Sequence, residues 1–281
     1  MIPAEFDYHR AESVDDAVSA LADGGDDAKL LAGGHSLLPL MKLRLAAPTL
    51  LVDVSRLDEL RGIDAEDGGW RIGAGTRHAE LQQRDDLGVV SHAASLIADQ
   101  QVRNRGTIGG SLAHGDPASD LPAVLLAAGG SVTARGRGGE RSIDAAELFR
   151  DYLTTAVEPD EVITSIAFPV LDQWTWGYEK FTRRSEDWAM VGVCALVKAS
   201  DGQCEDVRIG LTNMGSTPLR ASAAEDALRG GPLDAERIAA AAEQAADGTD
   251  PPGDLNATPD YKRHLAQTLT RRALEQAAGG G

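Results

Sequence analysis

The chain has 281 residues, of which 42% are hydrophobic, so it can form either one large domain or two modest domains with a sizeable core. Aromatic residues make up only 4%, so Ala, Leu, Val and Ile must supply most of that core. The formal net charge of −17 repels phosphate backbones, which argues against nucleic acid as a partner.

The N-terminus has neither the basic segment nor the apolar segment of a secretory signal. No run approaches the roughly 18 apolar residues of a membrane span, so we expect a cytoplasmic protein without an integral membrane segment. Cys194 and Cys204 are too few to hold an iron–sulfur cluster and do not fit a zinc site. We expect both thiols to be reduced and the chain to bind no metal.

The first part of the chain predicts a small βαβ unit. Residues 7–10 resemble a short strand, and Ser13 is placed to cap a helix that two glycines end. Residues 29–32 form an apolar strand that runs into a pair of glycines. A short helix over 36–43 and a buried strand over 50–54 complete the unit.

The next part has a different pattern. A turn and strand are expected at 68–73, and Thr76 is a candidate helix cap. A helix is predicted over 89–98, a long polar loop over 105–120, and a second helix over 121–128.

A hairpin follows, with its turn at Gly136 to Gly139, and then a strand over 161–168 that Pro169 closes. The composition places a domain boundary near residues 169–173. Beyond it the pattern predicts three strands and then three helices, over residues 175–182, 190–199, 206–212, 222–229, 233–246 and 259–277.

The segment 29–37 carries the clearest binding chemistry. Its adjacent glycines let backbone N–H groups point into one concavity, and the helix just beyond adds its unpaired N–H groups and positive dipole end. Ser36 offers a hydroxyl and Lys29 a neutralising charge, so the segment suits a pyrophosphate. Gly33 and Gly34 do not form the spaced Rossmann fingerprint, and the glycines alone favour a tight structural turn over a binding loop.

The segment 101–120 is too long and polar for a simple connector. It holds glycines that allow close backbone approach, hydroxyls, and carboxylates suited to ribose or ribityl groups: Gly106, Gly109 and Gly110; Thr107 and Ser111; Asp116 and Asp120. The alternative is a polar surface loop in which Asp120 caps the next helix. Two such segments on different subdomains predict that one long dinucleotide binds between them. This pattern does not distinguish FAD from another dinucleotide.

Three stretches resemble the flavoprotein medium subunits of aerobic carbon monoxide dehydrogenases. Residues 29–44 and 107–120 are similar to that family's two FAD loops. Residues 178–184, followed by 187–189, are similar to its third flavin-adjacent segment. The FAD domains of xanthine dehydrogenases are the next nearest relatives, and the likeness runs over nearly the whole chain.

The resemblance implies an α+β fold. Residues 1–172 would form a two-part FAD-binding domain of the vanillyl-alcohol oxidase and molybdenum hydroxylase type, with subdomains of about 1–56 and 57–172. Residues 173–281 would form a C-terminal domain with a three-stranded antiparallel sheet and a helix bundle.

The resemblance also implies which residues bind the cofactor. The two loops would hold the pyrophosphate, Asp120 would hydrogen-bond the cofactor, and Lys180 and Ile163 would lie near the flavin. Trp188 stands where the family commonly has a tyrosine beside the flavin ring. The full expected set is Lys29, Leu30, Leu31, Ala32, Gly33, Gly34, His35, Ser36, Leu37, Ile97, Gly106, Thr107, Ile108, Gly109, Gly110, Ser111, Asp116, Asp120, Ile163, Lys180 and Trp188.

His35 raises a separate question, because some flavoproteins of the wider fold attach FAD through a histidine in a Gly-Gly-His context. The family that this chain resembles does not, so we expect FAD to be bound non-covalently. No side chain is predicted to be catalytic, because the electron chemistry belongs to the cofactor.

The function implied is that of a FAD-carrying electron-transfer subunit of a molybdenum hydroxylase. Its partners would be a large subunit with the molybdenum cofactor and a small subunit with two [2Fe–2S] clusters, in an (LMS)2 heterohexamer. Two alternatives remain open: a self-contained FAD-dependent oxidoreductase with its own substrate pocket, and a non-enzymatic nucleotide-binding or assembly protein.

Overall fold

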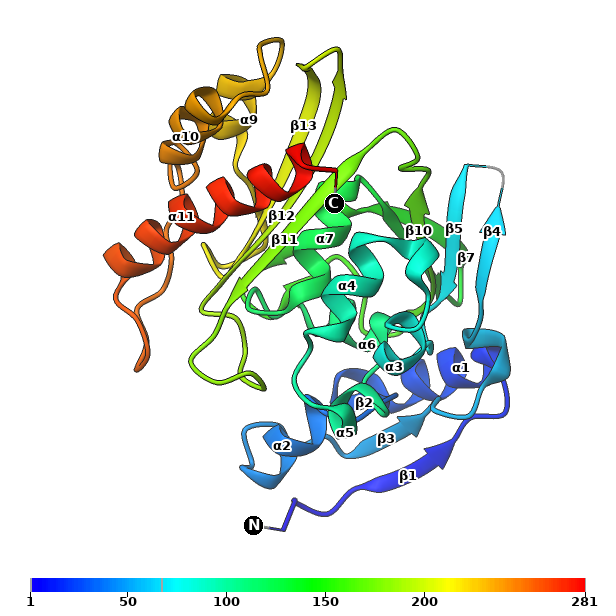
Figure 1. The fold of residues 1–281 in the computed structure, drawn as a ribbon. Coiled ribbons are helices and arrows are strands. Elements are labelled where there is room, and N and C mark those ends of the chain that lie inside the picture. Colours follow the sequence, from blue (N-terminus) through cyan, green and yellow to red (C-terminus); the bar gives the residue numbers. More distant parts are fainter. Residues whose placement is uncertain (1, 67, 281) are drawn as a thin grey trace.

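The computed structural model describes residues 2–66 and 68–280, whose strands form sheets of three, five and four strands and one two-stranded ribbon (Figure 1). The α+β class expected from the sequence is confirmed. Among the described residues, no helix combines the length and the apolar character needed to cross a bilayer.

The first sheet is parallel throughout, in the order β1-β3-β2. Its strands are β1 (Asp7–Arg10), β2 (Ala28–Leu31) and β3 (Leu50–Asp53). Helix α1 (Val14–Gly24) covers it on the side that faces the rest of the molecule, and α2 (Leu37–Lys42) connects β2 to β3 (Figure 1). This confirms the predicted βαβ unit.

Local chemistry explains where α1 begins and how it packs. The Ser13 hydroxyl accepts a hydrogen bond from the Asp16 N–H at 3.1 Å, and Gly25 ends the helix with a φ of 64°. The apolar residues spaced along one face are all buried: Val14, Ala17, Val18 and Leu21.

The second sheet is antiparallel, in the order β4-β5-β10-β6-β7. Its strands are β4 (Ile63–Glu66), β5 (Gly69–Gly73), β6 (Ser131–Gly136), β7 (Gly139–Asp144) and β10 (Val162–Pro169). Helices and a small ribbon surround it: α3 (His78–Leu81), α4 (Val89–Ser95), α5 (Gln100–Arg103), α6 (Ile108–His114), α7 (Asp120–Ala128), α8 (Ala145–Leu148), β8 (Phe149–Asp151) and β9 (Thr154–Thr155).

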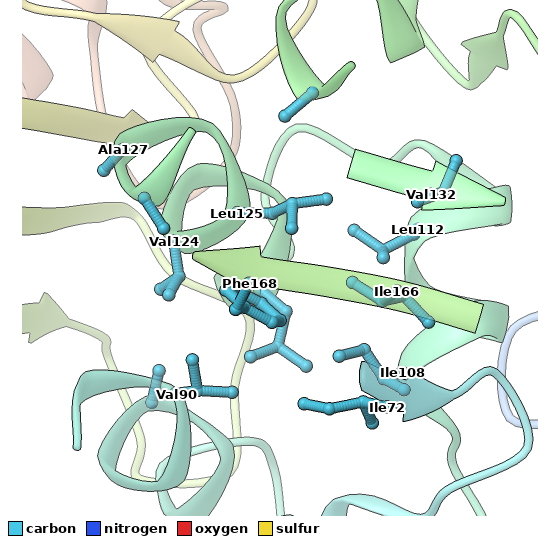
Figure 2. Close-up of a cluster of buried hydrophobic side chains, with 14 of the residues drawn as sticks. Ile72, Val90, Ile108, Leu112, Val124, Leu125, Ala127, Val132, Ile166 and Phe168 are labelled. Carbon is cyan, nitrogen blue, oxygen red and sulfur yellow. The ribbon is translucent and has the colours of Figure 1, made fainter. Parts of the chain in front are cut away.

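Between this sheet and its helices lies a core built mainly from aliphatic side chains, as the composition requires. Figure 2 shows Ile166 and Phe168 of β10 pointing among side chains of α6 and α7, with Ile108 and Leu125 close by. All four are buried, so this packing fixes α6 and α7 against the sheet.

The structure corrects three local predictions. Residues 105–120, expected as a loop, contain α6, because the Thr107 hydroxyl caps it by accepting from the Gly110 N–H at 3.1 Å. Thr76 is not the cap of α3; its hydroxyl donates to the Gly62 carbonyl, and Arg77 is the capping residue. Helix α4 ends at Ser95 instead of residue 98.

The third sheet is antiparallel, in the order β11-β12-β13-β14. Its strands are β11 (Thr175–Phe181), β12 (Val191–Ser200), β13 (Gln203–Thr212) and β14 (Leu219–Arg220). The three predicted strands are therefore present, and β14 adds two residues that the sequence analysis did not predict. Figure 1 shows α9 (Ser222–Leu228), α10 (Ala235–Glu243) and α11 (Pro259–Ala278) together beside this sheet.

Strand β12 is buried on both faces and joins two cores. Val193 and Val197 pack with the C-terminal helices, whereas Cys194 and Leu196 pack with the core around α7. Gly210 allows the close approach of α7, because a Cβ there would overlap the Ala123 carbonyl oxygen. The third sheet is thus fixed on both sides.

Candidate functional site

One cavity of about 950 Å³ receives both glycine segments. The segment after β2 lines one part of its wall, and the segment around the start of α6 lines another. Lys180 of β11 and the 186–188 turn complete the wall from the third sheet. Segments far apart in the sequence therefore meet at one site whose volume is typical of a cofactor pocket.

The first segment presents free backbone donors. The backbone N–H groups of Gly33, Gly34, His35 and Ser36 have no hydrogen-bond acceptor within residues 2–66 and 68–280. All four residues line the cavity, and none is buried. Gly34 has a φ of 76°, in the left-handed region that favours glycine. Consecutive free N–H groups in such a turn form an anion-binding concavity.

The second segment uses its backbone donors differently. The N–H of Gly109 donates to the Ala74 carbonyl at 2.9 Å, and that of Ile108 donates to the Thr76 carbonyl at 3.0 Å. The N–H groups of Gly110 and Ser111 are used in the capping turn of α6, on Thr107. Most of this segment's donors are therefore used inside the protein.

The two segments touch. A Cβ on Gly33 would overlap the carbonyl oxygen of Arg105 and would lie 2.8 Å from the Cα of Gly106. Glycine at position 33 is therefore required by the close approach of one segment to the other.

A buried ionic cluster lies at another part of the cavity wall. Lys180 Nζ donates to Asp120 Oδ2 at 2.8 Å and to the Leu96 carbonyl at 2.9 Å, and the Tyr178 hydroxyl donates to Asp120 Oδ1 at 2.7 Å. The Asp120 and Lys180 side chains are each 5% exposed. An ammonium has three N–H donors, so one remains for a ligand in the cavity.

Burial dominates the pKa values of Asp120 and Tyr178. Desolvation raises the pKa of Asp120 above its ordinary value, although Lys180 and the Tyr178 hydroxyl both act in the opposite direction. The pKa of Tyr178 is raised well above its ordinary value, first by burial and then by the Asp120 carboxylate. Tyr178 therefore remains a hydrogen-bond donor that fixes Asp120 in place.

Four arginines on the cavity wall were missed in the sequence analysis: Arg56, Arg61, Arg77 and Arg105. Arg61 Nη1 lies 3.6 Å from Asp58 Oδ1. In the described part of the chain, the other three have no carboxylate within 4.0 Å. They supply positive charge at the cavity of a strongly acidic protein, which favours an anionic ligand.

His78 was also missed, although it lines the cavity and is 4% exposed. Its backbone N–H donates to the Gly106 carbonyl at 3.0 Å, and a Cβ on Gly106 would lie 2.8 Å from its ring. Its Nδ1 has no hydrogen-bond partner among the described residues. Burial, with smaller contributions from Arg103 and His35, lowers the pKa of His78 to about 4, so the ring is neutral at pH 7.

Nineteen of the twenty-one predicted binding residues line the cavity; Ile108 and Asp116 do not. Ile108 is fully buried in the core, and Asp116 accepts from the Ala118 N–H within its own turn. Their positions give that part of the prediction no support. Lys29 lines the cavity, but its ammonium donates to the Asp26 carbonyl at 3.2 Å.

Ile97, Ile163 and Trp188 all lie on the cavity wall. Trp188 is 56% exposed, so it stands at the mouth and not in the core. Cys194 and Cys204 are free and buried, as expected for reduced thiols, and burial raises the pKa of Cys194 to about 12.

The chain matches two known domain families along nearly its full length. The FAD binding domain in molybdopterin dehydrogenase matches residues 4–171, and the CO dehydrogenase flavoprotein C-terminal domain matches residues 176–277. The two matches together cover the cavity and the third sheet.

Similar full-length proteins are known. The carbon monoxide dehydrogenase medium chain of Hydrogenophaga pseudoflava is 43% identical, over 99% of this chain and 98% of the relative. A 6-hydroxypseudooxynicotine dehydrogenase complex subunit alpha of Paenarthrobacter nicotinovorans is 41% identical, over 99% and 96%. A solved structure of reconstituted CO dehydrogenase from Oligotropha carboxidovorans aligns with a TM-score of 0.97 at 39% identity, over 100% of both chains.

Proposed function

The chain belongs to the FAD-binding subunits of the molybdenum hydroxylases of the CO dehydrogenase and xanthine dehydrogenase type, and from this membership we propose that it transfers electrons. In this proposal, electrons arrive from [2Fe–2S] clusters on a partner subunit and leave to an external acceptor. Bound FAD supplies the redox chemistry, because its ring accepts electrons singly and releases them as a pair.

The observation that carries the proposal is the row of N–H groups from Gly33 to Ser36 that, among the described residues, have no acceptor, on a cavity wall that also holds Arg56, Arg77 and Arg105. These donors fit a diphosphate, since each phosphate oxygen accepts hydrogen bonds and the arginines balance its charge. The net charge of −17 opposes such a ligand at long range, so local donors must provide the binding energy.

The Asp120–Lys180 pair supports the other part of the cofactor. Lys180 is held by Asp120 and by the Leu96 carbonyl, so its remaining N–H has a fixed direction. Asp120 in turn is fixed by Tyr178. We propose that this cluster orients the ring system and keeps a positive charge beside it.

In this proposal, Asp120, Lys180 and Tyr178 only position the flavin ring. None of them acts as a general acid or base. Substrate oxidation is proposed to take place on a large subunit with a molybdenum cofactor. A small [2Fe–2S] subunit would connect it to this chain in a cytoplasmic (LMS)2 complex. Within this chain, we propose that residues 1–172 form the FAD-binding domain and residues 173–281 the C-terminal domain.

Gly33→Ala tests the binding site. The added methyl overlaps the Arg105 carbonyl oxygen, so the first segment must shift and its donors lose alignment. Two weakened charge-assisted hydrogen bonds predict a loss of FAD affinity of about 100-fold. Gly138→Ala is the matched control, because its Cβ would meet nothing within 4 Å. Unchanged FAD stoichiometry and affinity in Gly33→Ala would contradict the assignment.

Electron transfer is tested with the FAD-loaded chain and its small subunit under anaerobic conditions. Reduced small subunit should bleach the flavin absorbance in a single turnover. If the isolated chain instead reduced its own flavin with an organic substrate, the self-contained oxidoreductase would be the better description.

A further inference from the structure

A buried asparagine outside the cofactor cavity, Asn213, joins two segments that reach the cavity wall. It follows the last residue of β13 and is 8% exposed. Its backbone N–H donates to the Pro117 carbonyl at 2.8 Å, in the turn before α7. Its side-chain Nδ2 donates to the carbonyls of Ala189 and Met190 at 2.9 and 3.1 Å, directly after Trp188. Asn213 therefore contacts both segments without lining the cavity itself.

Position 213 makes two demands that asparagine meets together. The φ of Asn213 is 62°, in the left-handed region that Asn, Asp and Gly adopt more readily than other residues. Both side-chain partners are carbonyl oxygens, which only accept, so the amide must present its two N–H groups. An ionised aspartate or a glycine would fit this backbone but would donate to neither carbonyl.

The segment of residues 182–190, which connects β11 to β12, depends on these two side-chain bonds. Residues 183–186 and Trp188 are exposed, whereas Ala189 and Met190 are buried. Among the described residues, the segment has two other backbone hydrogen bonds, and both lie within the β11–β12 hairpin. Arg183 Nη1 adds a long bond of 3.4 Å to Asn256 Oδ1. Asn213 thus supplies the bonds that join the buried end of the segment to β13.

Resting on the proposed function, we propose that Asn213 is a positioning residue that fixes the Trp188 indole at the mouth of the cofactor cavity. Trp188 and Asp120 line the cavity from the two segments that Asn213 joins. The bond to Pro117 is three residues before Asp120, and the bond to Ala189 is one residue after Trp188. Without the two amide bonds, the segment 182–190 can move away from α7 and carry the indole away from the flavin ring.

Trypsin tests this restraint, because the segment contains two adjacent cleavage sites, Arg183 and Arg184. In the full chain, Asn213→Gly keeps the left-handed backbone and removes both side-chain donors. Cleavage at these two sites should become about tenfold faster, because two neutral hydrogen bonds no longer hold the segment closed. Cleavage after Arg150, which is exposed in β8, should not change. Unchanged cleavage at Arg183 and Arg184, or an equal increase at Arg150, would overturn the proposal.

Asn213→Asp and Asn256→Asp form a matched pair, because each exchanges an amide for a carboxylate near the same segment. At position 213 the change removes both donors and turns a negative charge towards two carbonyl oxygens. At position 256 the bonded atom is the amide oxygen, and a carboxylate can still accept from Arg183. Only Asn213→Asp should accelerate cleavage of the segment. Equal acceleration in both variants would attribute the effect to the added charge and refute the role of Asn213.

Flavin fluorescence provides a readout that a purely structural role would not change. An indole beside a flavin ring quenches its emission, because the excited ring takes an electron from the indole. In the FAD-loaded chain, Trp188→Phe should raise the emission per bound FAD, and Asn213→Gly should raise it part of the way. Unchanged emission in either variant would overturn the positioning role.

The two measurements separate this proposal from the proposed function. If the purified chain bound no FAD, the proposed function would fail, whereas trypsin cleavage of the FAD-free chain would still decide whether Asn213 restrains the segment. If FAD bound normally and Asn213→Gly changed neither cleavage nor emission, only the role of Asn213 would fail.

Discussion

The two glycine segments at the cavity look alike in sequence and differ in structure. In the first, the N–H groups from Gly33 to Ser36 have no acceptor in the described part of the chain. In the second, the N–H groups of Ile108 and Gly109 are bonded to the strand end at Ala74 and Thr76. The N–H groups of the first segment are therefore available to bind an anion. Those of the second segment already hold α6 against the neighbouring backbone.

The glycines of the two segments also differ in how deeply they are buried. Gly106 and Gly109 are buried, whereas Gly33 and Gly34 are only partly so. A Cβ on Gly109 would lie 2.5 Å from the Ala74 Cβ and 2.8 Å from its carbonyl oxygen. Glycines can thus serve either ligand approach or backbone packing, and the state of their N–H groups tells the two apart.

The largest expected effect compares Gly109→Ala with Gly33→Ala in the FAD-free chain. Gly109→Ala forces α6 away from buried backbone, so we expect it to lower the free energy of unfolding by about 3 kcal/mol. Gly33→Ala should lower it by less, because Gly33 and Arg105 are less buried than Gly109 and Ala74. Denaturant unfolding of the two variants measures the difference, and equal losses would erase the distinction between the segments.

The next effect concerns His78, which supports the second segment through the Gly106 carbonyl. The pKa of His78 is lowered to about 4, from an ordinary value of 6.5, chiefly by burial. The unfolded chain therefore binds a proton between these two pH values that the folded chain does not. This contribution to stability is complete above pH 6.5 and falls as the pH drops towards 4, by about 3 kcal/mol in total.

His78→Leu should remove that pH dependence, because no proton is then taken up on unfolding. The measurement is the free energy of unfolding against pH, compared with the unmodified chain. His264→Leu, an exposed position on α11, is the control. A profile for His78→Leu that falls as steeply as that of the unmodified chain would mean that His78 is not the buried neutral group described above.

Sequence patterns predicted the regular parts of the fold well. Strand β12 was predicted because its apolar run is long, and α1 because its cap and apolar face coincide. Strands β11 and β13, which have mixed apolar and polar residues, were predicted as well. Helix α6 was not predicted, because Gly109 and Gly110 suggest a loop and only contact with Ala74 reveals why glycine is needed in that helix.

The site was predicted where its chemistry is local and missed where it is not. The segment from Lys29 to Leu37 stood out by its glycines, and it lines the cavity. Arg56, Arg77 and His78 carry no local signal, because their place at the cavity results from packing between distant segments. Neighbouring residues in a helix also point in different directions, which is why Ile108 enters the core although Thr107 reaches the cavity.

The smallest expected effects come from removing one side-chain hydroxyl from each segment, that of Ser36 or that of Thr107. Ser36 makes no side-chain capping bond and lines the cavity, so Ser36→Ala should weaken FAD binding by up to about tenfold and leave the free energy of unfolding unchanged. Thr107 caps α6, so Thr107→Val should lower the stability of the FAD-free chain by about 1 kcal/mol. FAD titration and denaturant unfolding are measured on both variants. If Ser36→Ala instead destabilised the FAD-free chain, the first segment would also be committed to the fold, because its donors would be supporting the protein and not the ligand.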